Sequence, residues 1–209
     1  MPSKALQDFE NRLEEVKQLM EAHGALTRLR RAEAALQSSG KNLQDIAQVV
    51  QHLVSSPGRG RPAEVHTLNS AAIALLSAHL QGFIVDIFKE VSGKILDGKV
   101  EDIEVIHATV NTRGNPNEYN IVRLFKVIGF SDVLDGVSWQ RMSNKQLRNK
   151  LQKFNQLRNR IVHGASEHVN KWAVENYQSV FTNLAHHMDS VLREKVRALT
   201  GRYPWGHRA

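Results

Sequence analysis

The residues with the clearest chemical potential lie in one short segment, residues 157–164 (LRNRIVHG). If this segment is helical, Asn159 and His163 lie four residues apart and share a face. Arg158 then projects about 100° away from Asn159 around the helix axis. The sequence therefore predicts an arginine, an asparagine and a histidine gathered at the carboxyl end of a helix.

These residue types can supply what RNA cleavage without a metal ion requires. The 2′-hydroxyl must lose a proton, the leaving oxygen must gain one, and the charge on the phosphorane must be stabilised. A histidine can act as base or acid near neutral pH, and an arginine can hold two phosphate oxygens with its planar guanidinium. An asparagine can orient the imidazole or bind the ribose. Because one chain supplies one such histidine, a two-fold dimer would make a fuller site.

A purely structural role is the alternative for the same residues. A histidine at the carboxyl end of a helix interacts favourably with the helix dipole and with the free carbonyl groups. A neighbouring arginine can simply be solvated. Arginine and histidine five residues apart form a loose pattern. The spacing alone therefore leaves both alternatives open.

Composition narrows the classes of protein to consider. The chain has 209 residues and no cysteine, so disulfides, thiolate catalysis and cysteine-ligated metals are excluded. A formal net charge of +7 and a pI of about 9.8 favour a polyanionic partner such as RNA, although many basic proteins bind no nucleic acid. Residues 1–15 are polar and the apolar run over residues 71–76 is short, so we expect a soluble cytoplasmic protein with no membrane partner.

Helical periodicity predicts an all-α protein. Apolar residues recur at spacings of three and four over residues 4–23, and a second helical stretch continues to about residue 54. Gly24 and the Ser38-Ser39-Gly40 segment are expected to interrupt or kink this region. Residues 65–92 are apolar on most faces, which is typical of the central helix of a bundle.

The second half of the chain predicts three further helices. Asn117 is expected to cap a short helix that ends near Gly129, and Ser143 is expected to cap a longer one. Gly164, just after the longer helix, is expected to adopt the left-handed conformation. A last helix is predicted over residues 167–199. The core face of the longer helix comprises Leu147, Leu151, Phe154, Leu157 and Ile161.

Breaker residues divide the chain into four parts. Residues 1–55 form an N-terminal helical segment, and residues 56–64 form a linker or loop within a Gly- and Pro-rich stretch. Residues 65–200 form the main helical domain. Residues 201–209 form an irregular tail.

Three segments resemble one protein family. Residues 157–164 resemble the arginine–asparagine–histidine signature of the HEPN superfamily. Residues 115–129 (NPNEYNIVRLFKVIG) and 75–86 (LLSAHLQGFIVD) are similar to stretches of its RiboL-PSP-HEPN-like branch. The resemblance covers roughly residues 65–199. It implies an HEPN-like bundle of four or more helices, here with additional N-terminal helices, and a homodimer with a composite cleft at its interface.

The resemblance also implies roles for individual residues. Arg158 and His163 would be catalytic, Asn159 would support them, and Arg160 beside them could bind phosphate. Active relatives are metal-independent endoribonucleases and often act as toxins or antiviral effectors. The expected partners are therefore RNA, a second copy of the chain and a cognate antitoxin protein, with no metal and no other cofactor.

One position departs from the branch. Gln81 stands where the earlier helix often has a glutamate, and a glutamine can hydrogen-bond an arginine but cannot neutralise it. This departure keeps a second hypothesis open, a non-catalytic helical module that binds RNA or a protein partner through the same dimer cleft. A third hypothesis, a DNA-binding helical protein, rests on charge alone.

Other residues are less suited to chemistry. His186 and His187 are adjacent and would point apart on a helix, which is poor geometry for a metal site. Trp139 and Trp172 are expected in the core or at an interface. Trp205 is expected in the tail.

Overall fold

The structure is a computed structural model and describes residues 1–38, 66–96, 105, 108, 115–165 and 167–206. The described residues form α1 (Lys4–Ser38), α3 (His66–Ile95), α5 (Glu118–Lys126), α6 (Asn144–Val162) and α7 (Lys171–Thr200). Within these ranges the β structure is limited to one isolated bridge, between Trp139 and Met142. The prediction of an all-α helical bundle is confirmed.

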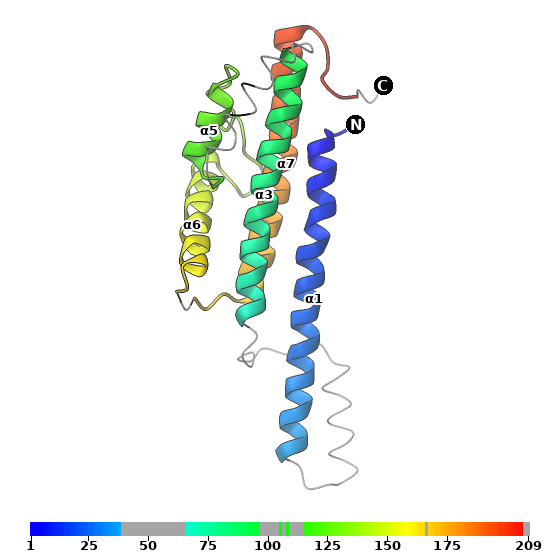
Figure 1. Cartoon of the computed structure of the whole chain (residues 1–209), viewed down its shortest axis with the longest axis vertical. Coiled ribbons are helices and arrows are strands. Elements are labelled where there is room, and N and C mark those ends of the chain that lie inside the picture. Colours follow the sequence, from blue (N-terminus) through cyan, green and yellow to red (C-terminus); the bar gives the residue numbers. More distant parts are fainter. Residues whose placement is uncertain (39–65, 97–104, 106–107, 109–114, 166, 207–209) are drawn as a thin grey trace.

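The helix predicted to be central is α3. It packs against α1, α5, α6 and α7 (Figure 1). The side chains of Phe83, Ile87 and Phe88 on this helix are fully buried. The Phe88 ring meets Phe125 of α5 edge-on, with the ring centroids 5.6 Å apart. Burial of this apolar surface is the main stabilising contribution to the bundle.

The apolar stretch of α3 is longer than the run at residues 71–76 that the sequence analysis identified. By length and composition, the 29 residues Thr67–Ile95 could cross a membrane, and 56% of their most apolar window is buried inside the protein. The core helix of a soluble domain has the same length and composition. The place of α3 among four other helices is that of a core helix.

The first helix, α1, runs without a break from Lys4 to Ser38. The predicted interruption at Gly24 is therefore wrong. A glycine inside a helix costs only about 1 kcal/mol, which is small beside the apolar surface that α1 buries. The predicted apolar stripe of α1 is buried throughout and comprises Leu6, Phe9, Leu13, Val16 and Met20.

Polar contacts fix the first half of α1 to the bundle. Arg12 forms an ion pair with Asp86 of α3, with 2.8 Å between Nη2 and Oδ2. His79 Nε2 lies 3.3 Å from a carboxylate oxygen of Glu15. Together with the buried stripe, these contacts make this part of the N-terminal helical segment a component of the core. The lower part of α1 extends past the amino end of α3 (Figure 1).

The helix that carries the candidate residues, α6, begins with the predicted cap. Ser143 accepts a hydrogen bond from the backbone of Gln146, and the Gln146 side chain accepts one from the Ser143 backbone, which completes a capping box. Phe154 is fully buried and lies edge-on to Phe181 of α7, with the centroids 4.6 Å apart. Leu157 and Ile161 pack against the core but are only partly buried. The core face is therefore tightest in the first half of α6.

The remaining predictions are met in part. Asn117 caps α5 as predicted, by accepting from the Asn120 backbone at 2.8 Å. The last helix begins at Lys171 rather than 167, because Asn170 provides its cap. Residues 201–206 are irregular, as expected. The second helical stretch beyond residue 38 and the linker at 56–64 lie outside the described residues.

Candidate active site at the carboxyl end of α6

The helix α6 ends where the sequence predicts. His163 is its exposed C-cap residue, and Gly164 follows with a φ of +79°, in the left-handed region that glycine favours. The Gly164 N–H donates to the carbonyl of Ile161 at 3.1 Å, and the Ala165 N–H donates to that of Arg160 at 2.9 Å. These two bonds form a Schellman motif. The motif ends α6 at His163, and so it places this histidine at the carboxyl end of the helix.

Arg158 is half-buried one turn before this end. Its Nη1 donates to Oδ1 of Asn159 at 3.2 Å. Its Nε is buried and has no hydrogen-bond partner among the residues that the structure describes. An unpaired buried donor costs free energy, so the guanidinium has unused capacity for an acceptor such as a phosphate oxygen.

A chain of asparagines joins this arginine to the start of α5. Asn159 Oδ1 also accepts from Nδ2 of Asn115 at 3.2 Å. The Asn115 carbonyl accepts from Nδ2 of Asn120 at 2.8 Å. Asn155, one turn before Asn159, donates to the carbonyl of Pro116 at 3.3 Å. Asn159 is therefore the junction between Arg158 and the entrance of α5.

The two other predicted site residues make different contacts. Arg160 forms an ion pair with Glu167, in the connection to α7. Burial raises the pKa of Tyr177 on α7, and the nearby positive charge of Arg160 opposes that shift. Gln81 is half-buried on α3, and no hydrogen bond joins it to Arg158, both residues being in the described part of the chain. The structure therefore brings Arg158 and Asn159 into contact and leaves Gln81 outside that contact.

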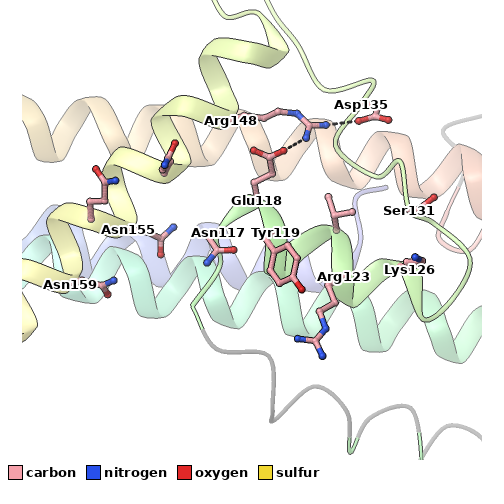
Figure 2. A pocket seen from close by; sticks show the side chains of 13 residues that line it. Asn117, Glu118, Tyr119, Arg123, Lys126, Ser131, Asp135, Arg148, Asn155 and Asn159 are labelled. Carbon is pink, nitrogen blue, oxygen red and sulfur yellow. Dashed lines mark hydrogen bonds and ion pairs between the residues drawn. The ribbon is translucent and has the colours of Figure 1, made fainter.

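A groove that the sequence did not reveal begins at Asn159. It has a volume of about 980 Å³ and lies between α5, α6 and the turns that follow α5. In Figure 2, Asn159 and Asn155 lie at one end and Lys126 and Ser131 at the other. Asn155 could have been connected to the site from the sequence, because it is four residues before Asn159 and shares its helix face.

One arginine, Arg148, connects the three segments that form the groove. Arg148 of α6 forms ion pairs with Glu118 of α5 and with Asp135 in the turns after α5 (Figure 2). The segment 131–137 forms hydrogen-bonded turns. Arg148 thus links three pieces of chain, and its own charge is balanced by two carboxylates.

The two adjacent histidines that the sequence analysis considered for a metal site contact other side chains of the protein. His187 stacks on Trp139, with the ring centroids 5.4 Å apart, and His186 lies 3.0 Å from a carboxylate oxygen of Glu10. In the described ranges, no three His, Asp or Glu side chains are placed to hold a metal ion. Trp172 is 70% exposed, so of its two predicted places the core is excluded, and an interface stays a prediction.

Comparison with known protein families gives a match over most of the chain. The family model described as RiboL-PSP-HEPN matches residues 37–194. No curated protein and no solved structure matches the chain. The matched range contains α3, α5, α6, most of α7 and every candidate site residue named above, whereas nearly all of α1 precedes it.

Proposed function

The chain belongs to the RiboL-PSP-HEPN family, and from this membership we propose that it is a metal-independent endoribonuclease with Arg158 and His163 as catalytic residues. One observation supports the proposal most. The arginine–asparagine–histidine signature lies at an exposed helix end, where the Arg158 Nε has no partner within the described ranges and His163 is open to solvent. Reactive groups that must meet a long polymer need such access.

The proposed reaction is an internal transesterification. The ribose 2′-oxygen attacks the adjacent phosphorus, and the bond from phosphorus to the 5′-oxygen breaks. The products are a 2′,3′-cyclic phosphate and a 5′-hydroxyl. One imidazole takes the proton from the 2′-hydroxyl and a second group gives a proton to the 5′-oxygen. Arg158 stabilises the negative charge of the phosphorane between these steps.

The neighbouring residues take supporting roles in this proposal. Asn159 already accepts a hydrogen bond from Arg158 and so limits the positions of the guanidinium. Arg160 adds positive charge beside the site, although its present partner is Glu167. Gln81 lies on α3 and would orient the arginine by a hydrogen bond when substrate is bound.

Assembly and context complete the proposal. A homodimer would bring two copies of His163 to one cleft, so that one imidazole acts as base and the other as acid. A nuclease of this kind fits a cytoplasmic toxin or phage-defence effector that is restrained by a cognate antitoxin.

A second candidate function is a non-catalytic module that binds RNA or a protein through the same dimer cleft. The observation that favours it is Gln81, which cannot neutralise Arg158 and forms no hydrogen bond with it among the described residues. The two candidates differ in one respect that can be measured, because only the first makes new RNA ends.

An unstructured RNA oligonucleotide tests the proposed chemistry. Incubated with the protein in EDTA, it is expected to yield fragments that end in 2′,3′-cyclic phosphate, measured by mass spectrometry. The same sequence with 2′-O-methyl groups at every position is expected to stay intact, because it lacks the attacking hydroxyl. Cleavage of the methylated strand, or cleavage that requires added Mg²⁺, would contradict the proposed mechanism. No cleavage of either strand would favour the binding module.

A further inference from the structure

We propose that the groove between α5 and α6 binds unpaired RNA and holds the nucleotides next to the scissile bond. This inference rests on the proposed ribonuclease function. Asn159 lines the groove and also accepts a hydrogen bond from the candidate catalytic residue Arg158. A strand in the groove would therefore lead directly to the candidate catalytic residues. The volume of about 980 Å³ is that of a site for a small ligand or a few nucleotide groups.

The floor of the groove contains a buried hydrogen-bond acceptor, the side-chain oxygen of Asn155. Asn155 is only 7% exposed, and its Oδ1 has no hydrogen-bond partner in the part of the chain that the structure describes. Its Nδ2 donates to the carbonyls of Pro116 and Leu151. These two hydrogen bonds fix the orientation of the amide group, so that its oxygen, and not its nitrogen, is the atom without a partner among the described residues. A buried acceptor in this state favours a ligand that donates, such as a base amino group or a ribose hydroxyl.

The α5 wall presents an aromatic ring to solvent. Tyr119 is 68% exposed at the groove, and Val122 and Arg123 lie on the same side of α5, three and four residues later. Figure 2 shows Tyr119 and Arg123 beside each other. Bases that are not paired can stack on such a ring, and an arginine beside it can contact the adjoining phosphate.

Charge around the groove favours a polyanion. Arg123 and Lys126 are exposed and have no ion-pair partner among the described residues, in contrast to Arg148 with its two carboxylates. The helix that forms the opposite wall, α6, has six basic residues and no acidic one along its length, and Arg148 is the one of the six that lines the groove. Those six are Lys145, Arg148, Lys150, Lys153, Arg158 and Arg160. Unpaired cations beside an exposed ring and amide groups are the combination that binds single-stranded RNA.

Binding is best measured separately from cleavage. In a His163→Ala background, fluorescence anisotropy of a labelled, unstructured RNA dodecamer gives Kd over a range of salt concentrations. Tyr119→Ala is expected to weaken binding by about 10-fold, whereas Tyr119→Phe retains the ring and the affinity. The Arg123→Ala/Lys126→Ala variant is expected to lower the slope of log Kd against log salt by about 1.4, from 0.7 for each phosphate contact.

A control variant removes two positive charges outside the groove. Lys89 and Lys94 are exposed on α3 and outside the groove, so Lys89→Ala/Lys94→Ala is expected to keep the parental salt slope. Duplex RNA of the same sequence is expected to bind less tightly and to be insensitive to Tyr119→Ala. Unchanged Kd and slope in the groove variants, an equal loss in the control, or equal sensitivity of the duplex would overturn the groove proposal. Wild-type protein that fails to cleave RNA would overturn the ribonuclease proposal and leave these binding results standing.

Discussion

Replacing His163 by alanine is expected to lower the rate of RNA cleavage by about 10²–10⁴-fold, the usual contribution of a general acid or base. The side chain is exposed at the C-cap of α6, so its removal takes no packing from the core. Loss of its favourable interaction with the helix dipole would cost at most about 1 kcal/mol of stability. The effect should therefore appear in the single-turnover rate and not in the folded population measured by circular dichroism.

Two companion variants test whether the effect is specific to this histidine. His186 is also partly exposed, on α7, and interacts with Glu10 away from the candidate site, so His186→Ala is expected to cleave at the wild-type rate. Arg158→Lys keeps the charge but loses the planar pair of donors, so it is expected to cleave much more slowly than wild type. A His163→Ala protein as fast as wild type would remove this residue from the mechanism.

The second large effect is expected at Phe154, which holds the site helix against α7. The ring is fully buried and contacts both Tyr177, at 4.9 Å between centroids, and Phe181, at 4.6 Å. Phe154→Ala removes these contacts and leaves a cavity, so we expect a loss of about 3–5 kcal/mol in the free energy of unfolding. Urea denaturation followed by circular dichroism measures this loss.

A control for the Phe154→Ala substitution is available on α7, the helix against which Phe154 packs. Leu199, near the end of α7, is 61% exposed, so Leu199→Ala is expected to change stability by less than about 0.5 kcal/mol. A loss below about 1 kcal/mol for Phe154→Ala would show that α6 is not fixed to α7 by this aromatic cluster. Because α6 carries Arg158 and Asn159, that result would also undermine the described geometry of the site.

Signals that act over a few residues were enough to predict α6 and its ends. Ser143 and Gln146 form their capping box within the first turn, and Gly164 takes the left-handed conformation directly after the last one. The apolar spacing from Leu147 to Phe154 identifies the buried face for the same reason. The candidate residues lie on this helix, so their positions along it followed from the sequence.

Features that depend on distant segments could not be predicted in this way. The groove is formed by α5 and α6, and the ion pair between Glu118 and Arg148 joins residues 30 positions apart. The continuity of α1 through Gly24 likewise does not follow from the local preference of glycine, which costs only about 1 kcal/mol inside a helix. The surface position of Trp172, in the first turn of α7, could not be predicted from its apolar character alone.

The most direct test of the central claim compares two proteins on one RNA. Wild type and the Arg158→Ala/His163→Ala variant, both shown to be folded, are incubated with mixed cellular RNA in EDTA, and the products are separated by electrophoresis. We predict fragments with wild type and intact RNA with the variant. Equal fragmentation by both proteins would contradict the assignment of the site to the end of α6, and intact RNA with both would contradict the ribonuclease function itself.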